Sequence, residues 1–270
     1  MANRMHVTSR EYKVMLLAQR FDGDEATMRE QVDAFWSDLS LRLAELNIPV
    51  EGEFSEVKAR RLIRFFDTQE HRLNADQYIV REREDLQTGE REVTLKFRHP
   101  DRYIAADRQM DPADADDFKT KFEEDVKPPF TSVYSFSTPQ PLKSGAVLQQ
   151  VRDVADLFPG LNSDLDELLV TQPLVLVSDF VGHEIVLEGA NILLGKKDIA
   201  SECAVVVWYD QGAEDTTPVV AEFSFKYGNE LEDYRGTIAR DAYAVLGMLQ
   251  SSLPDWVDAN PITKTAFVYR

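Results

Sequence analysis

The stretch that decides the fold, residues 60–98, reads RRLIRFFDTQEHRLNADQYIVREREDLQTGEREVTLKFR. It predicts three consecutive strands over 60–67, 77–85 and 92–98, since charged or polar residues tend to alternate with apolar residues along them. The sequence LQTGE between the second and third strands contains a glycine and is typical of a hairpin loop. Because side chains alternate between the two faces of a strand, one face of this sheet is apolar and the other is densely charged.

Three other segments, 9–17, 183–188 and 221–227, show a similar alternation of charged or polar residues with apolar residues. If these strands close into one barrel, with the apolar side outward under covering helices, the charged side lines a lumen. The alternative is an ordinary α/β protein whose charged strand faces meet water, as they commonly do in antiparallel sheets.

Several motifs in and around this stretch resemble those of the CYTH, or triphosphate tunnel metalloenzyme, family. The segments FFDT at 65–68, IVRER at 79–83 and TLK at 94–96, with Leu73, are similar to that family's core pattern. The family's N-terminal signature, Glu-x-Glu-x-Lys, is met by SREYK, with Ser9 in place of the first glutamate. Its late Glu-x-Glu strand is met by EFS, with Ser224 in place of the second glutamate.

The resemblance implies an α+β fold, an antiparallel eight-stranded β-barrel that is closed or nearly closed around a tunnel, with covering helices. It implies metal-dependent hydrolysis of a small molecule that contains tripolyphosphate: inorganic tripolyphosphate, thiamine triphosphate or a nucleoside triphosphate. Adenylate cyclases occur in the same family. A degenerate tunnel that binds polyphosphate or a nucleotide without turnover is the other alternative.

Binding a triphosphate away from bulk water requires a ring of basic side chains, because Arg makes forked contacts with phosphate and Lys supplies a compact charge. We expect the phosphate-binding residues to be Lys13, Arg64, Arg81, Arg83, Lys96, Arg98 and Lys226. The residues expected to be catalytic are Lys13, Arg81, Arg83 and Lys96.

Carboxylates between these cations would hold Mg²⁺ or Mn²⁺, since both ions prefer oxygen ligands. The expected metal ligands are Glu11 and Glu222, followed by Glu92 and Glu188. Ser9 and Ser224 each replace a carboxylate by a neutral hydroxyl, which lowers the negative charge of the site and should weaken metal binding.

Composition limits the classes of partner. The 270 residues suit a single domain, and 30 basic against 48 acidic residues give a net charge of −18. That charge repels a nucleic-acid backbone, so we expect no nucleic-acid partner, although a basic lumen would still attract a small polyanion. Cys203 is the single cysteine, which excludes an internal disulfide and a cysteine zinc site. No signal peptide and no membrane span are recognisable, so a cytoplasmic protein is expected.

The remaining pattern predicts helices and further strands. A helix begins after Asp24 and runs to about Leu46, a second begins at Asp111 and ends at 127–129, and others cover 145–158 and 230–250. Together, 111–171 is expected to be a helical elaboration between two strand-rich halves. Further strands are predicted over 132–137, 174–180, 183–188, 202–209 and 219–227, with a last one over 264–269.

Overall fold

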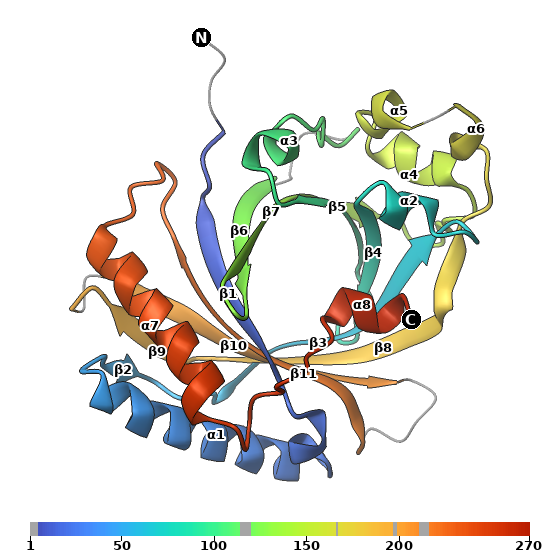
Figure 1. The fold of residues 1–270 in the computed structure, drawn as a ribbon. Coiled ribbons are helices and arrows are strands. Elements are labelled where there is room, and N and C mark those ends of the chain that lie inside the picture. Colours follow the sequence, from blue (N-terminus) through green and yellow to red (C-terminus); the bar gives the residue numbers. More distant parts are fainter. Residues whose placement is uncertain (1–4, 114–119, 166, 197–198, 211–215) are drawn as a thin grey trace.

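The computed structural model describes residues 5–113, 120–165, 167–196, 199–210 and 216–270, and its centre is a closed β-barrel (Figure 1). Within these residues, nine strands close the ring in the order β11, β1, β6, β7, β5, β4, β3, β8, β10 and back to β11. The nine are β1 (Ser9–Leu16), β3 (Glu56–Asp67), β4 (Tyr78–Asp85), β5 (Arg91–His99), β6 (Lys121–Lys127), β7 (Thr131–Leu142), β8 (Val175–Glu188), β10 (Ile199–Asp210) and β11 (Pro218–Gly228). Two short strands, β9 (Asn191–Leu194) and β2 (Val50–Glu51), extend the sheet from β10 outside the ring.

The α+β barrel agrees with the expected class, but it has nine strands and is not wholly antiparallel. The difference is β6, which pairs in parallel with β1 and antiparallel with β7. Its residues were assigned to the end of a helix, an assignment that is wrong; residues 114–119 of that helix lie outside the described residues. The run Glu123-Glu124-Asp125 hides the alternation, because acidic residues occupy both faces of the strand. Outside the barrel, Arg10 holds Glu124 at 2.6 Å.

Two long helices cover one side of the barrel. Helix α1 (Glu25–Glu45) begins where predicted, since the Asp24 side chain accepts a hydrogen bond from the backbone N–H of Thr27. Helix α7 (Gly236–Ser252) lies near it, and the short 3₁₀ helix η1 (Ala18–Phe21) precedes α1. The apolar stripes of α1 and α7 pack on the outer faces of β1, β8, β10 and β11, and together they form the largest apolar cluster among the described residues.

The other side of the barrel is covered by short helices. These are α2 (Arg72–Ala75), α3 (Arg102–Ala106), α4 (Val151–Leu157), α5 (Leu161–Asp164) and α6 (Glu167–Val170). A second apolar cluster joins them to the outer faces of β4, β5, β6 and β7. The expected helical elaboration over 111–171 is therefore only partly helical, because β6 and β7 belong to the barrel itself.

A third apolar cluster lies inside the barrel. Ile63 and Phe65 of β3, Trp208 of β10 and Val186 of β8 belong to it, and the chain's last helix, α8 (Lys264–Val268), contributes Val268. A strand was predicted for this tail and that prediction is wrong: the Thr263 side chain caps a helix instead. Apolar residues of β3, β8 and β10 thus line part of the lumen, although the same strands also carry Arg61 and Glu184, which form an ion pair. No helix within the described ranges is long and apolar enough to cross a lipid bilayer.

Candidate functional site

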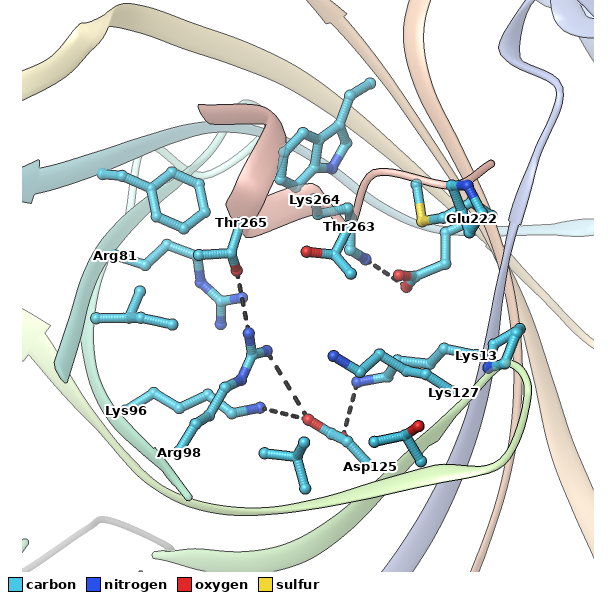
Figure 2. Close-up of a pocket in the computed structure, with 18 of the residues that line it drawn as sticks. Lys13, Arg81, Lys96, Arg98, Asp125, Lys127, Glu222, Thr263, Lys264 and Thr265 are labelled. Atoms are coloured by element: carbon cyan, nitrogen blue, oxygen red, sulfur yellow. Dashed lines mark hydrogen bonds and ion pairs between the residues drawn. The ribbon is translucent and has the colours of Figure 1, made fainter. Parts of the chain in front are cut away.

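A cavity of about 290 Å³ occupies the lumen beside α8 (Figure 2). Its charged lining consists of six cations and two carboxylates, which are Lys13, Arg81, Lys96, Arg98, Lys127, Lys264, Asp125 and Glu222. Its apolar lining includes Met15, Phe65, Ile79 and Trp208. A protein with a net charge of −18 therefore has an excess of cationic side chains in this one cavity.

Strand register explains why these side chains meet. On the β4–β5 hairpin, Arg81 lies opposite Thr94 and Ile79 lies opposite Lys96, so odd positions of β4 share a face with even positions of β5. On β1, Lys13 lies opposite Ser224 of β11. Figure 2 shows the side chains of Arg81, Lys96 and Lys13 pointing into the barrel. The hairpin supplies one wall of the cavity and the N-terminal strand supplies another.

Asp125 of β6 is the central anion of the charged wall. Its carboxylate lies 2.9 Å from the Lys13 ammonium, 3.5 Å from that of Lys96 and 3.8 Å from the Arg98 guanidinium. Burial alone would raise the pKa of Asp125, but these three cations outweigh burial and hold it well below its usual range. For Lys13, burial is likewise outweighed, and attraction by Asp125 and Glu11 raises its pKa.

Two other cations have too little negative charge around them. Burial lowers the pKa of Lys96 to about 7; Asp125 opposes the shift, while Arg98 and Lys13 add to it. Burial, followed by repulsion from Arg83, lowers the pKa of Arg81 to about 9, which leaves it charged at neutral pH. The Arg81 Nε is buried and has no hydrogen-bond partner within the described ranges. A bound anion would supply the missing compensation for both side chains.

The expected phosphate-binding residues divide into two groups. Lys13, Arg81, Lys96 and Arg98 all line the cavity. Arg64 was expected beside them, and this placement is wrong: on β3 the odd positions face the lumen, so Arg64 points outward and binds Glu82 at 2.8 Å.

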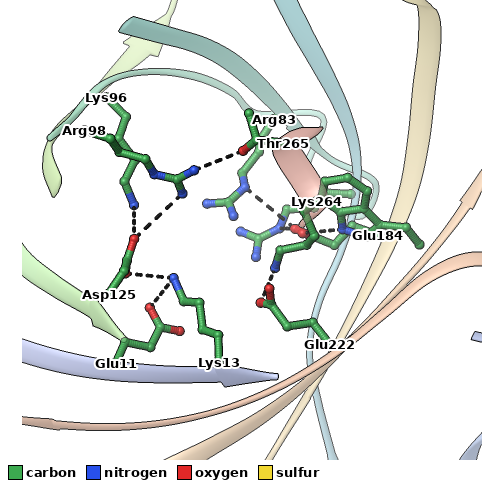
Figure 3. Close-up of polar contacts among 12 residues, drawn as sticks. Glu11, Lys13, Arg83, Lys96, Arg98, Asp125, Glu184, Glu222, Lys264 and Thr265 are labelled. Carbon is green, nitrogen blue, oxygen red and sulfur yellow. Dashed lines mark hydrogen bonds and ion pairs between the residues drawn. The ribbon is translucent and has the colours of Figure 1, made fainter. Parts of the chain in front are cut away.

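Arg83 and Lys226 face the lumen but lie toward its other end. The Arg83 Nε is 3.7 Å from Glu184, which Arg61 holds at 2.6 Å (Figure 3). Lys226 is 3.4 Å from Glu202. Arg61 and Arg83 line a second, more open cavity of about 690 Å³, whose lining also includes the β4–β5 loop. The seven expected cations therefore do not form one ring. Arg81 lines the cavity beside α8 but is also close enough to Arg83 to be repelled by it.

The four carboxylates expected to bind metal do not converge. Glu11 lies 2.9 Å from Lys13, and Glu222 lies 2.6 Å from Lys264, so each is already engaged by an ammonium group (Figure 3). The other two differ in place: Glu92 lines the second cavity, and Glu188 is a partly exposed residue 3.9 Å from Lys58. In the part of the chain that the structure describes, no three His, Cys, Asp or Glu side chains are grouped so as to hold a metal ion. The donor set fits a divalent cation poorly.

Sequence reasoning missed four residues of this site. Asp125 and Lys127 were assigned to a helix, although the inward positions 123, 125 and 127 alternate with Phe122 and Val126. That alternation, which Glu124 interrupts at an outward position, was the weak signal that could have found them. Lys264 and Thr265 had no such signal, because only the folded chain brings its last helix into the lumen.

No family model matches the chain, and no curated protein matches it. It is similar to a solved structure of a proposed adenylyl cyclase from Hippeastrum, described as having a dominant triphosphatase activity, with 12% identity, a TM-score of 0.45 and coverage of 97% of this chain and 95% of that chain. A proposed adenylate cyclase from Bacillus halodurans shows 11% identity, a TM-score of 0.42 and coverage of 90% and 91%. A third, from Vibrio parahaemolyticus, shows 10% identity, a TM-score of 0.37 and coverage of 98% of this chain and 99% of that chain. With TM-scores below 0.5, these likenesses establish neither family nor activity. The evidence for the barrel is the pairing of the strands in this structure.

Proposed function

We propose that the lumen binds the triphosphate group of a small molecule and that the protein hydrolyses a phosphoanhydride bond in it. One observation carries this proposal: the cavity beside α8 has six cationic side chains against two carboxylates. A cation-rich cavity inside an acidic protein selects a compact polyanion over a large one, because the outer surface repels long phosphate chains.

The chemistry would be positioning and charge stabilisation. In phosphoryl transfer the protein contributes mainly by holding the phosphates and by stabilising the charge that develops on their oxygens. Arg81 and Arg98 would grip phosphate oxygens through forked hydrogen bonds, and Lys96 would contribute a point charge. The apolar wall around Trp208 and Phe65 offers an organic group a surface to pack on.

The Mg²⁺ or Mn²⁺ requirement that the resemblance implies stays a prediction. If such an ion binds in the cavity, Glu222 is the carboxylate of the expected set that lines it, and the ion would stabilise charge on phosphate oxygens. The ion pair between Glu222 and Lys264 would first have to break.

A second candidate function is binding without turnover. It is favoured by the neutral hydroxyls that stand where the family has carboxylates: Ser9 donates a hydrogen bond to Glu123 at 2.7 Å, and Ser224 is buried beside the lumen. Adenylate cyclase activity is the third candidate and rests on the resemblance alone.

These candidates are separated by one set of assays. Phosphate release from tripolyphosphate, ATP and thiamine triphosphate is measured in Mg²⁺, in Mn²⁺ and in a chelator, and cyclic AMP formation from ATP is followed in parallel. We expect turnover of at least one triphosphate, with Lys96→Met lowering it and Lys58→Met, an exposed lysine outside the cavity, leaving it unchanged. Tight binding without any product would establish the non-catalytic candidate. If the protein neither bound a triphosphate nor formed a product, the hydrolytic and the non-catalytic candidates would both be contradicted.

The pH dependence of binding follows from Lys96. A bound polyanion stabilises the ammonium form and raises the Lys96 pKa from about 7, so the complex takes up a proton at pH 7–8. Affinity should therefore fall as the pH rises above about 7. Calorimetric titrations of tripolyphosphate in buffers of different ionisation enthalpy measure this uptake, and Lys96→Met provides the baseline for protons bound by the ligand. Equal uptake by the variant would show that Lys96 is not the group involved.

A further inference from the structure

The α8 helix places a lysine on the carboxylate that the resemblance assigns to a metal. The Lys264 ammonium is 2.6 Å from Glu222, which is 5% exposed (Figures 2 and 3). The same ammonium lies 5.6 Å from the centre of the Trp208 ring, within range of a cation–π contact. Lys264 therefore has two partners in the lumen, and its side chain is only 24% exposed.

The contacts of the rest of α8 fix the position of this lysine. Val268 is 1% exposed within the apolar cluster inside the barrel, and its carbonyl accepts a hydrogen bond from the Ser178 hydroxyl at 2.8 Å. Tyr269 donates to the buried carboxylate of Asp67 at 3.1 Å, and Arg98 donates to the Thr265 hydroxyl at 3.1 Å. A five-residue helix held at both ends positions its first side chain with little freedom.

The charges around Glu222 do not suit a divalent cation. Its neighbours are cations. Its charge adds to those of Asp125 and Glu11 in raising the pKa of Lys13, whereas it only partly offsets the burial that lowers the pKa of Lys127. A divalent ion placed there would find one carboxylate already paired and several ammonium groups close by, which is opposite to the carboxylate-rich surroundings that Mg²⁺ and Mn²⁺ prefer. The cavity's cations already outnumber its carboxylates by four without any metal.

We propose that the Lys264 ammonium, held by Glu222, is the site's own cation and takes the place of a divalent metal between the carboxylate and a bound triphosphate. This inference rests on the proposed function of the same lumen. It assigns to the site a triphosphate ligand that binds without metal, through Lys264 together with Arg81, Lys96 and Arg98.

The test is calorimetric titration of tripolyphosphate into the full chain in an excess of chelator. The wild-type protein is expected to bind, Lys264→Met to lose about 10-fold or more in affinity, and Lys264→Arg to keep most of it. Lys58→Met is the matched control, since that lysine is exposed and outside the cavity, and it should bind like the wild type. Circular dichroism checks that α8 and the barrel remain folded in each variant.

Glu222→Gln distinguishes the two accounts even if Lys264→Met fails to fold. If Glu222 is a metal ligand, the amide weakens tripolyphosphate binding in Mg²⁺ or Mn²⁺. If Glu222 instead neutralises Lys264, the amide leaves tripolyphosphate binding in chelator unchanged or makes it tighter. Binding by the wild type only when Mg²⁺ or Mn²⁺ is present would overturn this inference and leave the proposed function intact. No binding with metal or with chelator would overturn both.

Discussion

Changing Asp125 to asparagine is expected to lower the free energy of unfolding by about 3–5 kcal/mol, since removing one member of a buried charge cluster leaves the others without compensation. Asp125 is 3% exposed and lies within 4 Å of Lys13, Lys96 and Arg98. The amide keeps the shape of the side chain but removes the charge that offsets these cations. Urea denaturation measures the change, and Asp33→Asn on the exposed face of α1 is the matched control.

The pH dependence of stability gives the same prediction a second readout. The pKa of Asp125 is lower in the folded protein than in the unfolded chain, so the folded state gains stability above the ordinary aspartate pKa of about 3.9. This gain is lost as the pH falls from there toward the folded-state pKa. Asp125→Asn should therefore lose less stability on acidification below about pH 4 than the wild type loses. Identical acid profiles and a change in free energy below about 1 kcal/mol would contradict the role of Asp125 as the central anion.

Changing Arg81 to methionine is expected to move affinity and stability in opposite directions. Loss of a charge-assisted hydrogen bond should weaken tripolyphosphate binding about 10-fold to 100-fold. The free protein should become more stable, by about 1 kcal/mol, since the variant no longer buries a guanidinium whose Nε has no hydrogen-bond partner among the described residues. Calorimetry and thermal unfolding measure the two effects.

Arg64→Met is the control for this change, because it removes an arginine of the barrel's outer face. Arg64 binds Glu82 and Glu84, so its loss should destabilise the protein somewhat and leave affinity unchanged. A variant at Arg81 that binds as tightly as the wild type would remove Arg81 from the site. Equal losses of affinity at both positions would indicate a general effect of net charge.

The strands of residues 60–98 could be predicted well because their alternation has a period of two and ends at clear turns. The face that a residue such as Arg64 occupies could not be predicted equally well. An Arg64 that faced the lumen would turn its neighbours Ile63 and Phe65 outward, whereas β3 directs these two into the lumen beside Trp208. Closure of the barrel, and not the strand's own pattern, decides which face becomes the inside.

The carboxylates show a different limit of sequence reasoning. Glu11 and Glu222 do face the lumen, as expected, but a sequence cannot show which cation will reach each of them. Lys264 is 42 positions beyond Glu222 in the chain, and only the packing of Val268 inside the barrel brings the two together. Asp125 was missed for the related reason that its strand pairs in parallel with one that begins more than a hundred residues earlier.

The most direct test of a polyanion-binding lumen is calorimetric titration of tripolyphosphate into the wild-type protein at neutral pH, repeated at rising salt. The account predicts binding of one ligand per chain, weakened by salt and weakened further in Arg81→Met but not in Arg64→Met. Absence of binding at low salt, or binding that Arg81→Met leaves intact, would contradict it.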